Sequence, residues 1–394
     1  MKVLVLGGCG LQGKAVLQDL SRSPQVKEIV CADVNPKGLE PAKKYLDMTK
    51  IKIRELDARD KDALLSVMKD GIDVVIDVLP IDFLGTVAEA ALEAEVHLVN
   101  TLEGHMMPDD LHERAVERGL TIMPESGLDP GIDLILCGYG ASEMDEVLEL
   151  HSYCGGIPEV DAANNPLKYK ITWTWDGVLL SYKLPARIMR DGEIIDIPAK
   201  DQFARQWIGR LDFPGVGELE AILNGDAIIF AEHLGIVDTV KNTTRCSLRW
   251  PGHSEFWKKL VDLNFLSDEP VNGLPFKLTP HQFMVKHLEP QLQYEDDERD
   301  LVIMRNVIIG IKEGKMTKII FDLLDKRDME TGLFAMNRTV GYTASIVAQM
   351  IATGEINRRG LLTAVRDIPY KRFLEEIRKR GIKITKRTEV IEKG

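Results

Sequence analysis

The sequence predicts an α/β protein with an N-terminal, doubly wound parallel sheet and a second α+β domain whose sheet is mainly antiparallel. Strand-like and helix-like segments alternate strictly from Lys2 to Met123. A cluster of glycines stands between the first strand and the first helix. After Gly127 the alternation stops, and segments rich in Ile, Val, Trp and Tyr are separated by turn residues, as is typical of antiparallel strands.

The first part of the chain contains short, continuous apolar runs, which indicate strands buried on both faces of a parallel sheet. Segments with helical spacing of apolar residues connect them, and right-handed crossovers then place helices on both faces. The predicted strands are Lys2–Leu6, Glu28–Ala32, Ile51–Leu56, Asp73–Val78, His97–Val99 and Thr121–Met123, and the helices are Gly10–Leu20, Lys61–Lys69, Phe83–Ala94 and Pro108–Arg118.

The later part is predicted to contain strands at Tyr169–Trp173, Ile188–Arg190 and Ile194–Ile197, and a hairpin made by Leu301–Ile311 and Met316–Leu324. Alternation of Trp173 and Trp175 along the first of these segments predicts one face of a sheet core. Two helices are expected near the end, at Leu333–Ala352 and Pro369–Arg380, each followed by a glycine.

Composition excludes several classes of protein. The 394 residues carry a formal net charge of −12 and no stripe of Lys and Arg, so a nucleic-acid partner is not expected. No apolar run reaches the roughly 18 residues of a membrane span, and the apolar N-terminus continues into a helix pattern, unlike a signal peptide. Five scattered cysteines without CxxC spacing predict neither disulfides nor a metal site, and they favour a cytoplasmic location; they are Cys9, Cys31, Cys137, Cys154 and Cys246.

The glycine cluster contains a GxGxxG motif formed by Gly8, Gly10 and Gly13, with Leu11 and Gln12 between the last two. A buried strand precedes it and a helix follows it, which is the context that a Rossmann dinucleotide site requires. We expect Gly8 to allow the tight turn, Gly10 to let the backbone approach the diphosphate, and Gly13 to let the helix pack against the strand. The helix N-terminus then offers N–H groups to the phosphates.

Asp33 lies at the end of the second strand, twenty positions after Gly13. A carboxylate there accepts hydrogen bonds from both ribose hydroxyls and repels a 2′-phosphate, so the sequence favours NAD over NADP. Lys37 lies nearby and keeps NADP open as the alternative. Three further strand ends face the same crevice: we expect adenine contact from Asp57, a turn beside the nicotinamide at Leu79 and Pro80, and cofactor contact from Thr101.

Five segments in order along the chain resemble the saccharopine dehydrogenase-like family, which includes saccharopine reductase and lysine 6-dehydrogenase. The match spans almost the whole chain. The segments are ESGLDPGID at 125–133, SYCGGIP at 152–158, NPLKYK at 165–170, LRWPGH at 248–253 and TGLFAM at 331–336.

The resemblance implies a Rossmann NAD-binding domain at 1–126, a substrate-binding and dimerisation domain at 127–333, and C-terminal helices at 334–394 that return to the Rossmann domain. It implies hydride transfer between a nicotinamide and the CH–NH group of a lysine-like amino acid, in a homodimer formed through the second domain. No metal is implied.

The chemistry needs a group that removes a proton from the substrate amine, because only a free nitrogen lone pair assists the departure of hydride. Asp129, before Pro130 at a predicted helix start, is the first candidate, although helix capping explains it equally well. His253 is the second candidate, with a structural role as its rival.

A bidentate Arg is the natural partner of a substrate carboxylate, and Arg249 is the candidate, with a structural salt bridge as the alternative. The resemblance adds Tyr169 and Lys170 as residues lining the cleft, and Cys154 and Gly155 as further lining residues.

The sequence departs from its relatives at two places. Many relatives have Ser-Pro-Arg where Thr174, Trp175 and Asp176 stand, so an anion replaces a cation. Some place a Ser–aromatic pair where this chain has Asn100 and Thr101. Loss of the cation favours lysine 6-dehydrogenase, which forms 2-aminoadipate 6-semialdehyde and ammonia, over saccharopine reductase. A carboxynorspermidine-type reductase and a non-catalytic NAD-binding redox sensor stay open.

Overall fold

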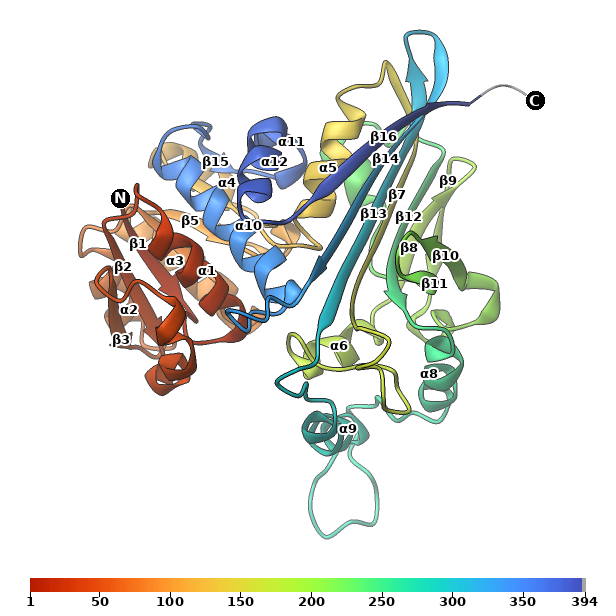
Figure 1. The fold of residues 1–394 in the computed structure, drawn as a ribbon, viewed down its shortest axis with the longest axis horizontal. Coiled ribbons are helices and arrows are strands. Elements are labelled where there is room, and N and C mark those ends of the chain that lie inside the picture. The colour runs from red at the N-terminus through yellow and green to blue at the C-terminus, as the bar shows by residue number, and fades with distance from the viewer. Residues whose placement is uncertain (392–394) are drawn as a thin grey trace. The chain divides into compact units, whose positions relative to one another are not determined.

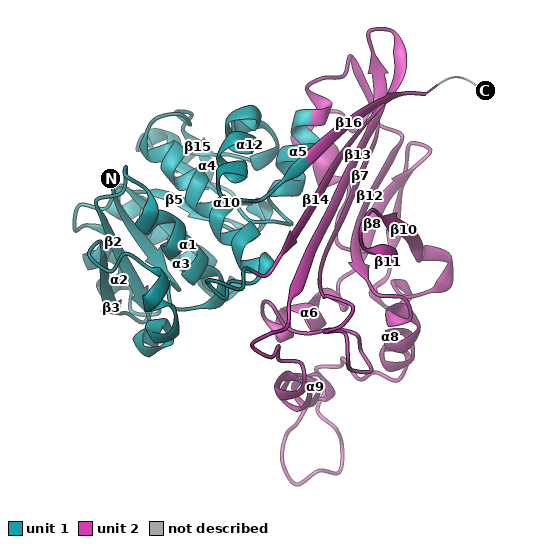
Figure 2. Cartoon of the chain, viewed as in Figure 1, with its two compact units in different colours: residues 1–139, 328–384 teal, residues 140–327, 385–394 magenta. Residues whose placement is uncertain are grey.

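The computed structural model describes residues 1–391, and the chain divides into two compact units. Figure 2 colours unit 1, residues 1–139 and 328–384, and unit 2, residues 140–327 and 385–394. The predicted boundaries at 126/127 and 333/334 refer to functional domains and stay a prediction. Each unit has its own sheet and is described by itself.

Unit 1 contains a seven-stranded sheet in the order β15-β6-β5-β4-β1-β2-β3, and every pair is parallel. Strand β1 is almost entirely buried, because helices cover both faces of a parallel sheet. The strands are β1 (Lys2–Leu6), β2 (Glu28–Asp33), β3 (Ile51–Glu55), β4 (Val74–Asp77), β5 (His97–Asn100), β6 (Thr121–Met123) and β15 (Gly360–Leu361). The predicted Rossmann fold is confirmed.

Helices of unit 1 come from both ends of the sequence. Helix α10 packs beside α1, as Figure 1 shows, and a Cβ at Gly341 would lie 2.7 Å from Cβ of Ala15, so this close approach needs glycine. The helices are α1 (Leu11–Arg22), α2 (Lys61–Met68), α3 (Leu84–Ala94), α4 (Leu111–Glu117), α10 (Ala335–Ala352), α11 (Ala364–Asp367) and α12 (Tyr370–Lys379), with 3-10 turns η1 (Pro36–Tyr45), η2 (Ile81–Phe83) and η3 (Gly104–Met106). Helix α5 (Ile132–Ala141) spans the boundary between the units.

Unit 2 is built on a nine-stranded mixed sheet with the path β10-β11-β12-β7-β13-β14-β16, and β8 and β9 attach to β12. Strands β12 and β7 pair in parallel. The other strand pairs whose register is described are antiparallel. The strands are β7 (Glu146–Pro158), β8 (Ala186–Arg190), β9 (Glu193–Ile197), β10 (Gly209–Phe213), β11 (Gly217–Leu223), β12 (Asn242–Arg249), β13 (Asp300–Lys312), β14 (Lys315–Lys326) and β16 (Ile384–Val390). The mainly antiparallel sheet and its long hairpin are confirmed.

Two predictions about local structure in this part are wrong. The segment 169–173 is not a strand: Tyr169 is buried among aromatic rings, Trp173 is 37% exposed, and Trp175 begins helix α6 (Trp175–Ser181). The C-terminal segment is not only helical, because β16 extends the sheet beside β14. Its side chains, which include Lys386, Arg387 and Glu389, are largely exposed, so the segment has no alternating apolar pattern from which a strand could be predicted.

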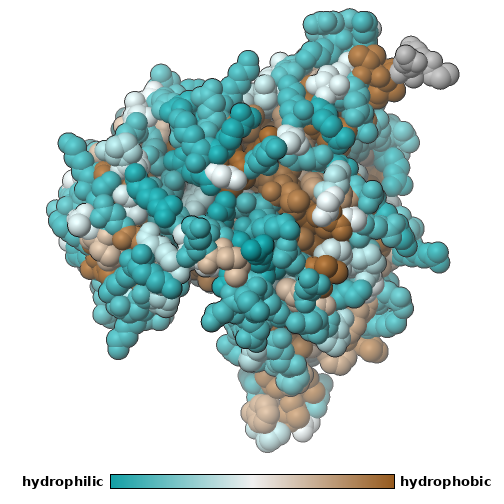
Figure 3. Space-filling model, viewed as in Figure 1, coloured by the Kyte–Doolittle hydropathy of each residue, from teal (hydrophilic) through white to brown (hydrophobic). Residues whose placement is uncertain are grey.

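The remaining helices of unit 2 are α7 (Ile229–Leu234), α8 (His253–Asp262) and α9 (Pro280–Leu288), with 3-10 turns η4 (Ala199–Asp201), η5 (Arg205–Trp207) and η6 (Glu289–Gln291). Exposed apolar side chains gather on and beside the loop between α8 and α9, which forms the hydrophobic lower end of Figure 3; they are Leu263, Val271, Leu274, Phe276 and Phe283. Among residues 1–391, none of the helices combines the length and apolar character needed to cross a bilayer.

Candidate functional site

The glycine turn of unit 1 has the close backbone contacts that the motif predicts. Gly7 has φ +75°, so the left-handed residue is Gly7 rather than Gly8. A Cβ at Gly13 would lie 2.3 Å from the Gly7 carbonyl oxygen and 2.5 Å from Cα of Gly8. Only glycine at position 13 therefore allows the start of α1 to pack against the turn. A Cβ at Gly10 would lie 3.2 Å from the Gly7 carbonyl oxygen, which is closer than most Cβ contacts in proteins.

The N-terminus of α1 is suited to an anion. Gly10 is the N-cap residue, no side chain caps the helix, and its first turn contains no acidic residue. The first N–H groups, at Leu11 and Gln12, thus keep the positive end of the helix dipole available to a phosphate. Together with the glycine contacts, this geometry fits the diphosphate of a dinucleotide.

Asp33 is hydrogen-bonded to the turn itself. Its Oδ2 accepts the Cys9 N–H at 2.9 Å, and its Oδ1 accepts the Asn35 N–H at 2.9 Å. Each carboxylate oxygen therefore stabilises the backbone of a loop beside the crevice. This arrangement differs from the predicted one, in which the same oxygens bind the two ribose hydroxyls.

The ends of β4 and β5 are joined by buried polar side chains. Asp77 accepts hydrogen bonds from the Leu79 N–H at 3.0 Å and from the Asn100 side-chain amide at 2.7 Å. The side-chain oxygen Oδ1 of Asn100 accepts the Leu102 N–H at 2.6 Å. Burial raises the pKa of Asp77 to about 6, although both hydrogen bonds oppose that shift. Asp77 and Asn100 fix the two turns that carry Leu79, Pro80 and Thr101.

These turns bring several of the predicted cofactor residues to one edge of the sheet. A Cβ at Gly7 would lie 3.2 Å from Cδ2 of Leu79, so the turn after β4 lies against the glycine turn. Asp57 lies at the end of β3 and is held by an ion pair with Arg59 at 2.6 Å. The predicted cofactor residues follow the carboxyl ends of neighbouring strands, as a dinucleotide crevice requires.

Asp129 lies in the loop that leads into α5. The peptide bond between Asp129 and Pro130 is cis, and α5 begins at Ile132, so Pro130 is not the first residue of the helix as predicted. The Gly131 N–H donates to Asp133 at 2.7 Å, so Asp133 is the residue that stabilises this turn. A Cβ at Gly127 would lie 3.5 Å from Cβ of Thr101, so this loop adjoins the end of β5.

In unit 2, Arg249 at the end of β12 is 7% exposed. Its guanidinium lies over the Tyr169 ring at 5.3 Å, donates to the Leu248 carbonyl at 2.9 Å, and has Nε 3.5 Å from the Tyr182 hydroxyl. Among residues 1–391, no carboxylate pairs with it. A buried, unpaired cation is costly, so Arg249 is the described group best suited to receive an anion.

The Tyr169 hydroxyl lies beside Arg249 and is also unsatisfied. Within residues 1–391 it is buried and has no hydrogen-bond partner, and burial raises the pKa of Tyr169 to about 12. It therefore stays protonated and can donate a hydrogen bond to an acceptor next to Arg249.

His253, the first residue of α8, supports this cluster. Its Nε2 lies 2.8 Å from the Tyr182 hydroxyl. Burial, together with the Arg249 charge, holds the pKa of His253 well below its usual range, so the ring is neutral. The position fits a residue that orients Tyr182, and through it Arg249.

Lys170 is committed to another partner. Its Nζ lies 2.6 and 2.5 Å from the two carboxylate oxygens of Glu298, and the two side chains are 6% and 12% exposed. Asn164 also donates to Glu298 at 3.0 Å. The ion pair ties the segment after residue 168 to the loop before β13, which favours a structural role for Lys170.

Cys154 and Gly155 lie on β7, next to the strand that carries Arg249. A Cβ at Gly155 would lie 2.7 Å from the Leu248 carbonyl oxygen, which accepts a hydrogen bond from Arg249. Gly155 thus leaves room for the carbonyl that positions the guanidinium, a role that the sequence could not specify.

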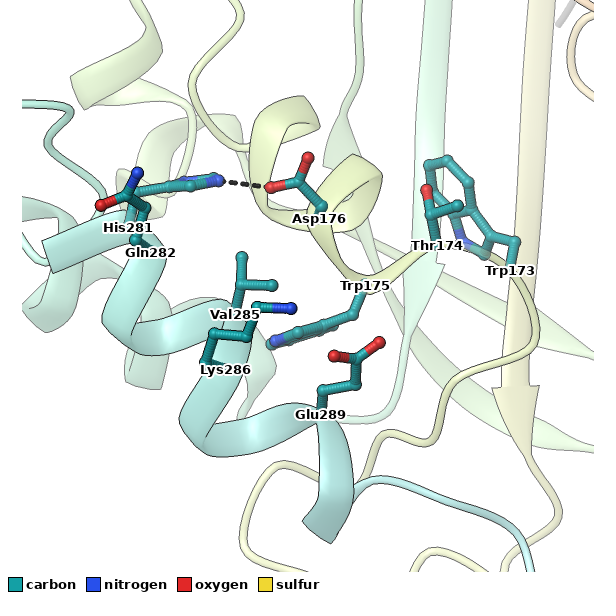
Figure 4. A pocket seen from close by; sticks show the side chains of 9 residues that line it. All are labelled: Trp173, Thr174, Trp175, Asp176, His281, Gln282, Val285, Lys286 and Glu289. Atoms are coloured by element: carbon teal, nitrogen blue, oxygen red, sulfur yellow. Dashed lines mark hydrogen bonds and ion pairs between the residues drawn. The ribbon is translucent and has the colours of Figure 1, made fainter. Parts of the chain in front are cut away.

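A cavity of about 510 Å³ lies between α6 and α9 (Figure 4). Two of the residues that line it, Asp176 and His281, are hydrogen-bonded to each other, with the Asp176 carboxylate 2.7 Å from His281 Nε2. Trp175, whose ring is also 5.7 Å from that of Tyr169, lines its base. The anion that replaces the cation of many relatives therefore faces this cavity and pairs with a histidine.

Sequence reasoning did not identify Asp77 or Tyr182. Asp77 is the one charged residue at the end of an otherwise apolar strand, and this pattern could have identified it from the sequence. Tyr182 follows a short helix and has no distinguishing spacing. Among residues 1–391, no three or more His, Cys, Asp or Glu side chains are grouped so that they could hold a metal ion.

Comparison with known proteins identifies the family. The model of the saccharopine dehydrogenase C-terminal domain matches residues 127–382, and that of the saccharopine dehydrogenase NADP binding domain matches residues 3–123. The chain belongs to the saccharopine dehydrogenase family. It is 27% identical to the saccharopine dehydrogenase [NADP(+), L-glutamate-forming] of Saccharomyces cerevisiae, over 92% of this chain and 93% of that protein.

Two other similarities extend the comparison. The mitochondrial alpha-aminoadipic semialdehyde synthase of Mus musculus is 27% identical over 97% of this chain. The match covers 47% of that relative, so this chain spans about half of its length. The apo structure of the L-Glu-forming saccharopine dehydrogenase of Saccharomyces cerevisiae has a TM-score of 0.83 at 25% identity and covers 98% of this chain and 99% of that one. The expected family is confirmed.

The expected cofactor was wrong. The family model of the N-terminal part is that of an NADP-binding domain, and the yeast relative is named for NADP(+), so NADP replaces NAD. In the structure the Asp33 carboxylate accepts hydrogen bonds from the Cys9 and Asn35 N–H groups. Each of its oxygens keeps a further lone pair for a ribose hydroxyl, so the assignment of NADP rests on the family model and on the name of the yeast relative.

Proposed function

We propose that this protein is an NADP-dependent saccharopine dehydrogenase of the glutamate-forming type. Saccharopine carries a secondary amine between a lysine-like and a glutamate-like portion. In the proposed reaction a carbon next to the nitrogen loses hydride to the nicotinamide, the nitrogen loses its proton, and a C=N bond forms. Water then adds, and the C–N bond breaks to give glutamate and 2-aminoadipate 6-semialdehyde.

The observation that carries the proposal is the buried Arg249 without a carboxylate partner among residues 1–391. Saccharopine is rich in carboxylates, and a guanidinium binds a carboxylate through two parallel hydrogen bonds. The Tyr169 hydroxyl, which is buried and has no hydrogen-bond partner in the described part of the chain, supplies a further donor. Family membership and the names of the yeast and fission-yeast relatives support the same substrate.

In this proposal NADP supplies the hydride acceptor, and the residues of the chain bind and orient. The glycine turn and the start of α1 hold the diphosphate, and exposed Lys37 after β2 holds the 2′-phosphate. His253 is a positioning residue, because it acts on Arg249 through Tyr182. Asp129 stays the candidate for removing the amine proton.

One observation favours a second candidate function, lysine 6-dehydrogenase. Asp176 stands where many relatives carry a cation, and it is paired with His281 at 2.7 Å. A site with one cation fewer suits a substrate with fewer carboxylates, and free lysine has only one.

The test is turnover of purified full-length protein with NADP(+) at alkaline pH, followed at the NADPH absorbance band. We expect NADPH to form with saccharopine and not with lysine. Formation with lysine alone, with release of ammonia, would establish the second candidate instead. A carboxynorspermidine-type substrate is the third arm of the panel, and tight NADPH binding without turnover in any arm would indicate a redox sensor. The cytoplasmic location and the homodimer stay predictions.

A further inference from the structure

Two of the five cysteines lie against each other beside the glycine turn. The sulfur of Cys9 is 3.7 Å from the sulfur of Cys31, and both side chains are buried, at 5% and 0% exposure. None of the five cysteines, all of which lie within residues 1–391, is in a disulfide. Cys9 lies inside the GxGxxG motif, between Gly8 and Gly10, whereas Cys31 lies on β2.

The pair is mechanically linked to the phosphate-binding backbone. The Cys9 N–H donates to Asp33 at 2.9 Å, and a Cβ at Gly8 would lie only 2.6 Å from the Cys31 sulfur. A disulfide brings two sulfurs to about 2.0 Å. The sulfurs must therefore approach by more than an ångström, and the tightly packed turn has to move with Cys9.

We propose that Cys9 and Cys31 form an oxidisable dithiol whose disulfide ties the glycine turn to β2 and blocks binding of NADP(H). The inference rests on the proposed cofactor site at that turn. A hydroperoxide is the class of oxidant. One thiolate attacks the peroxide oxygen, giving a sulfenic acid and an alcohol, and the second thiol then displaces water to form the S–S bond.

Overall, the two thiols lose two electrons and two protons and form the S–S bond. The hydroperoxide gains them, its O–O bond breaks, and one alcohol and one water are released. Burial raises the pKa of Cys9 and Cys31, so the thiolate is scarce and the reaction is slow compared with that of an exposed thiol. A bound dinucleotide covers the turn, and we therefore expect it to protect the pair from the oxidant.

The experiment treats reduced full-length protein with tert-butyl hydroperoxide, with and without NADPH. Peptide mass spectrometry then looks for a Cys9–Cys31 cross-link, and a fluorescence titration measures NADPH affinity. We expect the cross-link to form, NADPH affinity to fall by at least about tenfold, and dithiothreitol to restore it. Preincubation with NADPH should slow cross-linking.

Variants separate this chemistry from general oxidation. Cys9→Ser and Cys31→Ala should each keep their NADPH affinity under peroxide, whereas Cys246→Ser in unit 2 should respond like the parent protein. A cross-linked protein that binds NADPH as tightly as the reduced protein overturns the proposal. Oxidation of other thiols without a Cys9–Cys31 cross-link also overturns it. This result is read by mass spectrometry of the parent protein and does not depend on whether a variant folds. Failure of the reduced protein to bind NADPH would instead count against the proposed cofactor site.

Discussion

The buried carboxylate of Asp77 accepts a hydrogen bond from the side-chain amide of Asn100, at 2.7 Å across the ends of two neighbouring strands. This pair fixes the turns that follow β4 and β5, so its ionisation affects the stability of unit 1.

Burial raises the pKa of Asp77 to about 6. The folded state then binds a proton more tightly than the unfolded chain, where an ordinary Asp titrates near about 4. We expect the free energy of unfolding to fall as the pH rises from about 4 to about 6.5, with this group contributing on the order of 3 kcal/mol. Chemical denaturation across that pH range measures it.

Asp77→Asn should remove this fall, because an amide does not ionise. Asp57→Asn is the matched control: the Arg59 hydrogen bonds lower the pKa of Asp57 to about 2, so its titration lies below the window. If the parent protein and Asp77→Asn have the same slope between those pH values, Asp77 is not the group responsible.

Gly13→Ala should abolish NADPH binding, because the new Cβ would meet the Gly7 carbonyl oxygen at 2.3 Å. Backbone cannot rotate away as a side chain can, so the turn must change shape. Gly85→Ala is the control, since nothing lies within 4 Å of a Cβ at that helical position. We expect it to bind NADPH normally and to gain up to about 1 kcal/mol of stability. Equal NADPH affinity in both variants would contradict the geometry of the turn.

Arg249→Lys should raise KM for the amino-acid substrate and lower kcat/KM by about 10- to 100-fold, because lysine cannot make two parallel hydrogen bonds. NADPH affinity, measured by titration, should not change. Arg210→Lys in the exposed strand β10, whose partner is Glu218, should leave the kinetics unchanged. A variant at Arg249 with parental KM would remove this residue from the proposed carboxylate site.

Lys170→Met should lower the free energy of unfolding by about 3 kcal/mol, since it leaves the buried carboxylate of Glu298 without the cation that neutralises it. Combining it with Glu298→Leu should recover most of the loss. Lys52→Met, which breaks an exposed pair with Glu28, should cost less than about 1 kcal/mol. Unchanged stability in Lys170→Met, with a raised KM, would restore the predicted role in substrate binding.

Lys37→Gln should weaken NADPH binding by about tenfold and NADH binding much less, because only NADPH carries the 2′-phosphate. Lys37 is exposed and makes no ion pair within residues 1–391. Lys27→Gln, just before the opposite end of β2, is the control and should alter neither affinity. Equal loss for both cofactors would place the 2′-phosphate elsewhere.

The parallel sheet of unit 1 could be predicted because its strands are continuous apolar runs and a glycine motif marks the crevice. The cofactor could not be predicted in the same way. Asp33 has the type and spacing of a residue that selects NAD, yet the family model and the yeast relative point to NADP, so one residue at this position does not decide the cofactor.

The substrate side depends on contacts between distant segments. Arg249 was identified from a motif, whereas the Tyr182 hydroxyl, 3.5 Å from its Nε, lies far away in the chain and has no local signal. Lys170 was assigned to the cleft from its motif, and its partner Glu298 is 128 positions later. Tertiary packing determines contacts between residues so far apart in the sequence. The local spacing of apolar and polar residues carries no information about them.

The packing of α10 on α1 has a consequence for how the nucleotide-binding half is made and engineered. A helix synthesised more than 300 residues later covers the residues beside the glycine turn, with Gly341 pressed against Ala15 and the Gln12 carbonyl. During translation that surface stays bare until α10 has left the ribosome, so holdase chaperones should bind the nascent chain through most of its synthesis. A graft that moves this half into a chimera must carry residues 328–384 as well as residues 1–139.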